Sequence, residues 1–515
     1  MQTLWLDKEK LHIEELVDVA RNHRRVGVSA DGEGRISKAR TLIERWIKEK
    51  RVIYGITTGF GAMCNVTIPE TEIEQLQMNI LMSHAAGVGP PLPAEDVRAI
   101  MALRVHDLCM GHSGCRIQTV QHLVTLLNAG IVPVVPEKGS VGASGDLAPT
   151  AHLGLVLIGK GEAFYRGERI PGKQVLARVN LPPLVLKAGE GLALINGTQV
   201  MTAIGALVVH DAVRLSKLAD IACAMSLEVL MGSQSEFDPH IHNVRPHPGQ
   251  IVTAHNILRL TAGSEIIASH RGCARVQDAY TLRCSPQIHG ASKDAVRHAR
   301  SVLDIEINAT TTNPLVFPDI DDIRLGGNFH GQPIAMAADY LSMGLAELGS
   351  VSERRVERLV NPQLSGLPGF LVNNGGLNSG YMVAQYTAAA LVSENKVLAH
   401  PACVDSIPTS ANKEDHVSMG TIAIRQTREI LHNVEHIIAI ELICAAQAYD
   451  LLNERHPLAY GHGTQAAYDV IRRHVPCLKK DREVHRDIEK VIAVMRSDKL
   501  LKSVESAVGG LKGFA

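Results

Sequence analysis

The chain has 515 residues, which is enough for about three average domains, and 45% of them are hydrophobic and 20% charged. Its formal net charge of −1 provides no basic surface for nucleic acid or anionic membranes, so we expect a small-molecule substrate or a protein partner. No apolar signal segment opens the chain and no apolar run is long enough to cross a bilayer, which predicts a cytoplasmic protein.

Helical periodicity dominates the first 195 residues, where Gly- and Pro-rich segments separate amphipathic stretches. The second helix is expected to open at Ser37, after the glycine-rich residues 31–34. One short hairpin is predicted around residues 162–170, turning at Arg166-Gly167. The predicted helices span residues 6–24, 37–49, 71–85, 95–110 and 118–127.

Beyond residue 195 the helical patterns become much longer, at residues 198–231, 332–359 and 416–452. In the last of these, apolar pairs recur every seven residues, which is typical of helices packed in a bundle. We therefore predict an all-α protein with a smaller, mostly helical N-terminal domain at 1–195 and a long-helix bundle at 196–515. The pairs are Ala423/Ile424, Ile430/Leu431, Ile437/Ile438, Cys444/Ala445 and Leu451/Leu452.

The cysteines and histidines do not form a recognisable metal motif. Nine scattered cysteines without a Cys-x-x-Cys pair suit reduced thiols and argue against a disulfide framework or a cysteine-rich zinc site. Three of the 24 histidines crowd into residues 240–247, but the prolines around them and the absence of His-Glu-x-x-His favour a structural loop. We expect no metal site, and no complete dinucleotide or Walker A fingerprint is present.

The most informative stretch is residues 139–149, Gly-Ser-Val-Gly-Ala-Ser-Gly-Asp-Leu-Ala-Pro. Glycines at 142 and 145 permit a compressed turn in which a backbone amide attacks a carbonyl two residues upstream. A structural alternative is a turn into a helix, with Ser144 or Asp146 near the N-cap. The serine-hydrolase elbow Gly-x-Ser-x-Gly does not fit, because Asp146 stands where its second glycine belongs.

Two polar side chains before this stretch are candidate site residues. Tyr54 lies in a loop with flanking glycines that can bring a phenol against a substrate, although such a tyrosine is more often a packed aromatic. His84 ends a predicted helix whose chain turns at residues 87–89, where it could instead be a partner of the helix dipole.

Further candidates follow the stretch. Asn196 precedes a long helix, where an ordinary role would be an N-cap. Gln277, Tyr280 and Arg283 can share a helical face at i, i+3 and i+6, and an arginine fork suits an α-carboxylate.

Two more candidates stand near the long helices that close the chain. Phe329 lies between glycines, with a core position as its alternative. Glu414 comes just before the longest helix, where an acidic residue could be a dipole partner.

Taken in this order, these blocks resemble the aromatic amino acid ammonia-lyase family across nearly the whole chain. The resemblance implies the long-helix bundle of the ammonia-lyase and fumarase/aspartase superfamily, and a homotetramer whose sites are each built from three subunits. It implies that Ala143-Ser144-Gly145 cyclises, without any external cofactor, to a 4-methylideneimidazol-5-one prosthetic group. It further implies catalytic roles for Tyr54, Tyr280 and Glu414, and substrate binding by His84, Asn196, Gln277, Arg283 and Phe329.

Within the family, Ser83-His84 and Glu414 are similar to the histidine-using branch, although Thr57 stands where the family usually has asparagine. This implies conversion of L-histidine to trans-urocanate and ammonia, the first step of histidine degradation. Whether the electrophile takes the amine or the imidazole ring stays open, as does the base. Two alternatives remain: a phenylalanine or tyrosine ammonia-lyase or aminomutase on the same scaffold, and a non-catalytic helical assembly protein.

Overall fold

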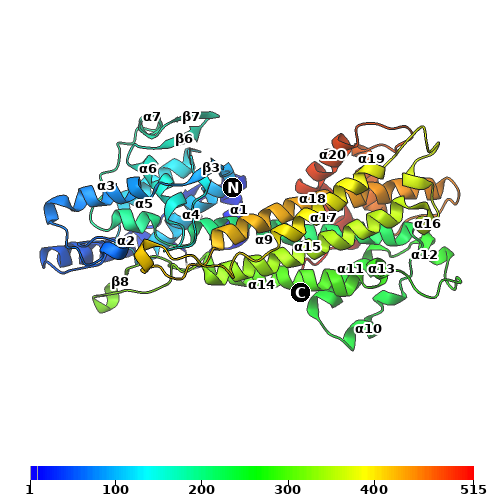
Figure 1. Ribbon diagram of the computed structural model, residues 1–515, viewed down its shortest axis with the longest axis horizontal. Coiled ribbons are helices and arrows are strands. Elements are labelled where there is room, and N and C mark those ends of the chain that lie inside the picture. The colour runs from blue at the N-terminus through cyan, green and yellow to red at the C-terminus, as the bar shows by residue number, and fades with distance from the viewer. Residues whose placement is uncertain (1, 9, 515) are drawn as a thin grey trace. The chain divides into compact units, whose positions relative to one another are not determined.

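The computed structural model describes residues 2–8 and 10–514, and it confirms the predicted all-α fold class (Figure 1). The chain divides into two compact units made of non-contiguous segments. Unit 1 comprises Met1–His210, Arg300–Asp339 and Pro401–Arg425, and unit 2 comprises Asp211–Ala299, Tyr340–His400 and Gln426–Ala515. The domain boundary between residues 195 and 196 stays a prediction.

Unit 1 combines short and medium helices with small strand pairs. The predicted hairpin is confirmed as β6 (Glu162–Tyr165) paired antiparallel with β7 (Glu168–Pro171), and β4 (Val132–Pro133) extends this sheet. The other pairs are β1 (Leu4–Trp5) with β2 (Val26–Gly27), β3 (Val88–Pro91) with β5 (Pro136–Lys138), and β8 (Leu315–Phe317) with β9 (Asp322–Arg324). Its helices are α1 (Ile13–Arg21), α2 (Ala30–Lys48), α3 (Ile73–His84), α4 (Ala94–Cys109), α5 (Ile117–Asn128), α6 (Leu147–Leu157), α7 (Gly172–Arg178) and α8 (Glu190–Ile195).

The first two helices differ from their predicted bounds. Helix α1 begins only at Ile13, because the backbone N–H of His12 donates to the Glu15 carboxylate at 3.0 Å and fixes the helix start there. The predicted start of α2 at Ser37 is wrong: Ser29 is the N-cap and accepts from the N–H of Gly32 at 3.4 Å. Gly32 lies in the first turn of α2, where a Cβ would lie 2.6 Å from the Cβ of Asp7. Gly32 therefore allows close packing against Asp7, and neither it nor Gly34 breaks the helix.

Four long helices have residues in both units: α9 (Gln199–Val229), α14 (Ser285–Glu306), α15 (Gln332–Val360) and α18 (Gly420–Asn453). Their unit 2 portions run side by side with α17 (Met382–Leu398) (Figure 1). The seven-residue pairs of α18 are buried as predicted, except Leu452, which is half-buried. The remaining helices of unit 2 are α10 (Pro239–Asn243), α11 (Pro248–Leu260), α12 (Glu265–Ser269), α13 (Tyr280–Arg283), α16 (Pro362–Ser365), α19 (His462–His474), α20 (Val484–Arg496) and α21 (Lys499–Val508).

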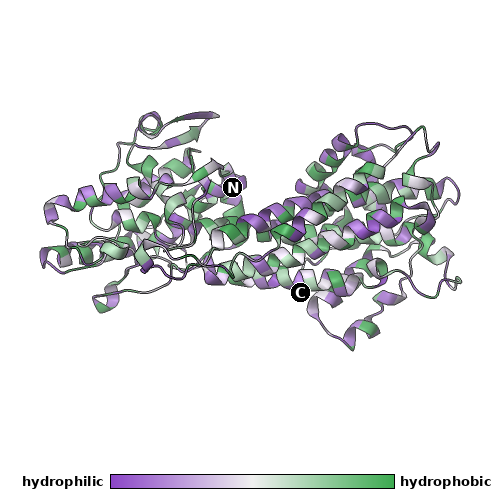
Figure 2. Ribbon diagram, viewed as in Figure 1, coloured by the Kyte–Doolittle hydropathy of each residue, from purple (hydrophilic) through white to green (hydrophobic). Residues whose placement is uncertain are grey.

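The long helices carry both hydrophobic and hydrophilic residues along their length (Figure 2). In the part of the chain that the structure describes, no helix is long and apolar enough to cross a membrane. Helix α18 begins at Gly420, four residues later than predicted, because Met419 has a left-handed φ of 55°. Glu414 therefore lies in a loop and not at a helix start.

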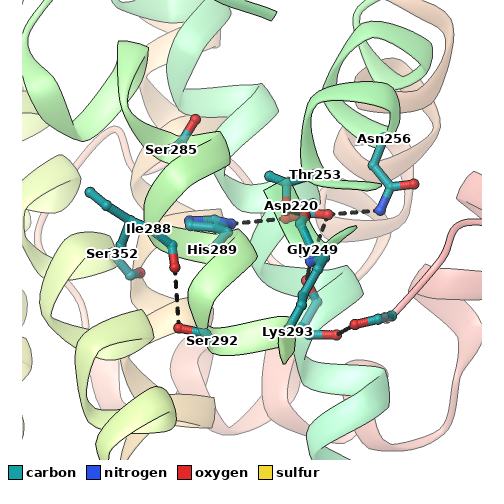
Figure 3. A network of polar contacts seen from close by, with 12 residues as sticks. Asp220, Gly249, Thr253, Asn256, Ser285, Ile288, His289, Ser292, Lys293 and Ser352 are labelled. Carbon is teal, nitrogen blue, oxygen red and sulfur yellow. Dashed lines mark hydrogen bonds and ion pairs between the residues drawn. The ribbon is translucent and has the colours of Figure 1, made fainter. Parts of the chain in front are cut away.

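Unit 2 holds a fully buried network of polar and charged side chains, part of which is shown in Figure 3. We call it the Asp220 network, and its members are Asp220, Asn256, His289, Lys293, Arg355 and Glu441. The Asp220 carboxylate accepts hydrogen bonds from His289 at 2.8 Å and Asn256 at 2.8 Å, and it lies 2.9 Å from the Lys293 ammonium. One bond further, His289 Nε2 is 3.3 Å from Arg355, which forks onto Glu441 at 2.5 and 3.0 Å. Each buried charge faces an opposite charge, as the cost of desolvation requires.

Candidate active site

A cavity of about 580 Å³ in unit 1 brings together four of the predicted site residues. Tyr54, His84, Ser144 and Glu414 all line it, although they come from segments far apart in the chain. This volume and a mostly apolar wall with a few convergent polar groups are typical of a small-molecule site. The apolar part of the wall consists of Phe60, Met63, Val66, Ile68, Leu76, Ile80, Leu147 and Leu192.

The Ala143-Ser144-Gly145 segment forms a tight turn at the cavity. Ser144 has a left-handed φ of 49°, which costs a non-glycine residue conformational energy, and it lies between Gly142 (φ 87°) and Gly145 (φ 82°). A Cβ on Gly145 would come 2.1 Å from the Gly197 carbonyl oxygen, and one on Gly142 would come 2.2 Å from the hydroxyl of Ser418. Only glycine fits at either position, so the turn is held in a compressed form around Ser144.

Asp146, directly after this turn, has a role that the sequence did not reveal. It is the N-cap residue of α6, as the structural alternative held, but its carboxylate accepts from the N–H groups of Val200 and Met201, at 3.0 and 2.9 Å, in the first turn of α9. Burial raises its pKa, and a hydrogen bond from Thr421 opposes that rise. The turn is thereby fastened to two helices that begin far away in sequence.

The Tyr54 phenol lies in the cavity wall with its oxygen accepting from the N–H of Gly61 at 3.3 Å. Burial raises the pKa of Tyr54, the Gly61 hydrogen bond partly opposes this, and the nearby Glu414 charge raises the pKa further. The phenol is therefore neutral near pH 7 and carries a proton that it can donate.

His84 is the last residue of α3, as predicted, and its Nδ1 lies 3.0 Å from the Ser83 hydroxyl. Burial lowers the pKa of His84, while a hydrogen bond to the Ile80 carbonyl and the Glu414 charge oppose that shift. Glu414 is held by its neighbour Thr409, whose hydroxyl donates to the carboxylate at 2.9 Å. The cavity thus combines a neutral imidazole with a carboxylate.

The loop before Glu414 also lines the cavity, and sequence reasoning missed it. Ser410, Ala411 and Asn412 all have left-handed φ angles, of 49°, 51° and 65°, without a glycine among them. The Ser410 hydroxyl accepts from the N–H of Ala62 at 3.2 Å, so this strained loop is tied to the loop of Tyr54. Asn412 is of a type that tolerates a left-handed φ, but Ser410 and Ala411 carry no such signal, because glycine is the usual marker.

Asn196 and Phe329 belong to unit 1 but do not line the cavity. Asn196 is the C-cap of α8 and not the N-cap of α9, and its side-chain amide donates to the Asn313 carbonyl at 3.0 Å. The next residue, Gly197, pairs directly with the turn: its N–H donates to the Ser144 carbonyl at 3.1 Å and its carbonyl accepts from Asp146 at 2.8 Å. Phe329 is half-buried in the turn before α15.

Gln277, Tyr280 and Arg283 all lie in unit 2. The predicted helical face is wrong for Gln277, because α13 contains only Tyr280–Arg283 and Gln277 lies in an exposed irregular segment, where it lines a separate cavity of about 590 Å³. Tyr280 is 68% exposed, and the Arg283 guanidinium lies 4.7 Å from the centre of its ring. Arg283 itself is half-buried.

Comparison with known proteins places this geometry in context. A sequence profile described as aromatic amino acid lyase matches residues 11–473. The chain is 57% identical to a histidine ammonia-lyase of Gloeobacter violaceus, covering 99% of this chain and 98% of that protein. It is 53% identical to a histidine ammonia-lyase of Alkaliphilus oremlandii, covering 99% of both chains.

Solved structures agree with the sequence matches. The crystal structure of histidine ammonia-lyase from Trypanosoma cruzi superimposes with a TM-score of 0.91 at 43% identity, covering 99% of this chain and 96% of that one. Tyrosine aminomutase from Streptomyces globisporus gives 0.93 at 39% identity, covering 98% and 99%. The profile match, the full-length relatives and the shared helical architecture together show that this chain belongs to the aromatic amino acid lyase family.

Proposed function

We propose that the protein is a carbon–nitrogen lyase that converts L-histidine to trans-urocanate and ammonia, the first step of histidine degradation. The observation that carries this proposal is the shared cavity of Ser144, His84 and Glu414. The cavity brings Ser144, the proposed source of the electrophile, close to His84 and Glu414, two polar side chains that can hydrogen-bond to an imidazole. The identity of 57% to a histidine ammonia-lyase supports the same substrate.

Recognition of the substrate ring follows from the chemistry of the cavity. Neutral His84 can exchange a hydrogen bond with an imidazole nitrogen, and Glu414 can accept the N–H of the other nitrogen. The apolar wall contacts the faces of the ring. A phenyl ring would leave both polar groups desolvated without a partner, so the cavity favours histidine over phenylalanine.

The residues at the turn fit the precursor of 4-methylideneimidazol-5-one. Ring closure joins the Gly145 nitrogen to the Ala143 carbonyl carbon and releases two waters, one with the carbonyl oxygen and one with the Ser144 hydroxyl. The positive φ of Ser144 and the glycine-only neighbours are what a turn compressed for this closure requires. Once formed, the group supplies the electrophile that makes the amino group a better leaving group.

The remaining side chains would bind the substrate and move its protons. We assign proton transfer to Tyr54, Tyr280 and Glu414, with the β-proton removed by Tyr54 or Tyr280, or by Glu414. Arg283 would fork onto the α-carboxylate. Asn196 and Gln277 would bind the substrate beside it, and Phe329 would pack near the electrophile.

We further propose a homotetramer, in which Gln277, Tyr280 and Arg283 of other copies complete each cavity. Two features of unit 2 support this assembly. Tyr280 and its neighbour Val276 are 68% and 94% exposed, as groups waiting for a partner would be. Large apolar side chains are also exposed on α15 and α17, and a second copy packed against these helices would bury them. They are Tyr340, Met343, Val383, Tyr386 and Val397.

The decisive experiment incubates the purified protein separately with L-histidine, L-tyrosine and L-phenylalanine and follows product absorbance. We expect urocanate from histidine and background rates with the other two. Mass spectrometry of the peptide that contains residues 143–145 should show the loss of two waters. Turnover of phenylalanine or tyrosine in preference to histidine would contradict the proposed substrate.

A second candidate is an aminomutase, which the structural likeness to tyrosine aminomutase favours. Such an enzyme would return the amine to the β-carbon and release a β-amino acid. Chromatography of the histidine reaction separates the two, since only the aminomutase yields β-histidine. A non-catalytic assembly protein would show neither product nor the loss of two waters.

A further inference from the structure

The position of the Ser144 turn depends on the short segment that pairs with it. Gly145 and Gly197 form a parallel bridge, through the hydrogen bonds that join Gly197 to Ser144 and Asp146. Because a Cβ on Gly145 would lie 2.1 Å from the Gly197 oxygen, the two backbones are in close contact. Any displacement of Gly197 is therefore transmitted to the turn.

One buried guanidinium holds the segment just before Gly197. Arg104, in the last half of α4, is 1% exposed, and its Nη1 donates to the carbonyls of Asn196 at 2.8 Å and Ala193 at 3.1 Å. The two carbonyls belong to the C-terminal end of α8, and Asn196 is its C-cap. A charged donor at this point fixes where the chain leaves the helix.

The next turn of α4 holds the segment just after Gly197. Asp107 accepts from Arg104 at 3.3 Å and from the Gln199 side-chain amide at 3.1 Å. That amide also donates to the Thr311 hydroxyl at 3.0 Å, which in turn accepts from the N–H of Thr198 at 3.3 Å. The residues before Gly197 are thus hydrogen-bonded to Arg104, and those after it are linked to Asp107.

Arg98, six residues earlier on the same helix, shows what a purely structural arginine looks like. It is 2% exposed, and all three of its side-chain nitrogens donate to carbonyls, those of Val19, Ala20 and Leu127, at 2.8 to 3.2 Å. By contrast, Nε and Nη2 of Arg104 find no hydrogen-bond partner among the described residues. Arg104 thus directs Nη1 to the carbonyls of Ala193 and Asn196, while its Nε and Nη2 stay without a partner among the described residues.

We propose that Arg104, with Asp107, is a positioning residue for formation of the prosthetic group, because it sets the position of Gly197 and so keeps the Gly145 nitrogen aligned with the Ala143 carbonyl carbon. The inference rests on the proposed function, since it concerns the tripeptide assigned there as the precursor. Ring closure needs reacting atoms in near-attack geometry, and a misplacement of about 1 Å can slow such a step about a hundredfold.

The test compares Arg104→Met and Arg104→Lys with the matched control Arg98→Met. Each folded protein is digested at intervals after synthesis, and mass spectrometry gives the fraction of the 143–145 peptide that has lost two waters. We expect ring formation about a hundredfold slower in Arg104→Met. Arg104→Lys should be intermediate, since one ammonium cannot reproduce both carbonyl bonds. Arg98→Met should lose stability but convert at the wild-type rate.

Three outcomes decide the question. Conversion at the wild-type rate in folded Arg104→Met would overturn the inference, and so would equal slowing in Arg98→Met, because the effect would then be general destabilisation. If Arg104→Met is not recovered folded, Arg104→Lys decides, and a wild-type rate in that variant overturns the inference. Absence of the two-water loss in the wild-type protein would instead remove the proposed prosthetic group itself.

Discussion

One buried polar network in unit 2 and one buried polar cluster in unit 1 differ in how fully their atoms are hydrogen-bonded. In the Asp220 network of unit 2, the carboxylates of Asp220 and Glu441 each accept hydrogen bonds from several donors, and each faces a buried cation. In the cluster of Arg104, Asp107, Asn196 and Gln199 in unit 1, every member has a polar atom without a hydrogen-bond partner among the described residues. A satisfied network rigidifies a fold, whereas a partly satisfied one costs stability and marks a site where geometry serves another purpose.

The pKa values of two buried carboxyls express the same contrast. Burial alone would raise the pKa of Asp220, but Lys293 and His289 more than offset it, so the pKa lies below its ordinary value. Burial raises the pKa of Asp107 to about 6, and Arg104 only partly opposes the shift. The surroundings of Asp220 therefore favour its charged form, whereas those of Asp107 favour its protonated form.

The largest expected effect separates function from stability at the turn. Ser144→Ala removes the hydroxyl whose loss would create the proposed methylidene, so we expect turnover of histidine to fall by on the order of 10⁵-fold, the scale seen when a reactive centre is deleted. The free energy of unfolding should change little, since the hydrogen bond described for Ser144 is made by its backbone carbonyl, which the substitution keeps. Steady-state kinetics and urea unfolding measure the two quantities. Retained activity without the two-water loss would refute the assignment.

The next effect concerns the polar end of the cavity. The double variant His84→Leu with Glu414→Gln should reduce kcat/KM for histidine by about four powers of ten, because the imidazole then lacks both partners. The 143–145 peptide should still lose two waters, because the hydrogen bonds described for these two side chains go to other residues and not to that turn. Wild-type kcat/KM with the prosthetic group present would show that the imidazole is bound elsewhere.

Breaking the Asp220 network should lower the free energy of unfolding and leave formation of the prosthetic group unchanged. Asp220→Asn leaves Lys293 buried without its counter-charge, which we expect to cost about 3–5 kcal/mol of unfolding free energy. Ring formation should proceed as in the wild type, because the network lies within unit 2. Urea unfolding at neutral pH together with the peptide mass checks both parts. A loss below about 1 kcal/mol would mean that the network relaxes or hydrates.

The smallest effect is a pair of opposite pH signatures. Folded Asp107 binds its proton more tightly than the unfolded chain, so the wild type loses up to about 3 kcal/mol from this group as pH rises from 3.8 to about 6. Asp107→Asn leaves Arg104 without its counter-charge, a cost that does not depend on pH, but the difference in unfolding free energy between variant and wild type should shift in favour of the variant as pH rises across that window. The loss of unfolding free energy caused by Asp220→Asn should stay constant across the same pH window. It should shrink only below about pH 4, because the folded pKa of Asp220 is lowered from 3.8. Unfolding curves between pH 3 and 8 test both signs.

Sequence patterns predicted the body of most helices but not where they begin. Apolar periodicity located α4, α9 and α15 to within a residue or two, since a buried face leaves a continuous signal. The starts of α1, α2 and α18 depended on a cap, a glycine packed against Asp7 and a left-handed Met419. Those are local or tertiary details that a periodic pattern does not contain.

The candidate site divides in a similar way. Family resemblance predicted Tyr54, His84, Ser144 and Glu414, and the structure places them around one cavity. The supports were missed: the Asp146 bonds to α9, the strained loop of Ser410–Asn412 and the clamp of Arg104. Each support joins segments far apart in sequence, and a single sequence read by itself carries no signal of such pairing.

The attachment of Asp146 has a consequence for engineering. Its carboxylate bonds to a helix 54 residues away and to Thr421, 275 residues away. The shape of the turn is thus a property of the assembled unit, and residues 139–149 moved alone into another helical scaffold should remain an ordinary, unreactive peptide. A designer who wants the proposed electrophile elsewhere must transplant the surrounding framework with it.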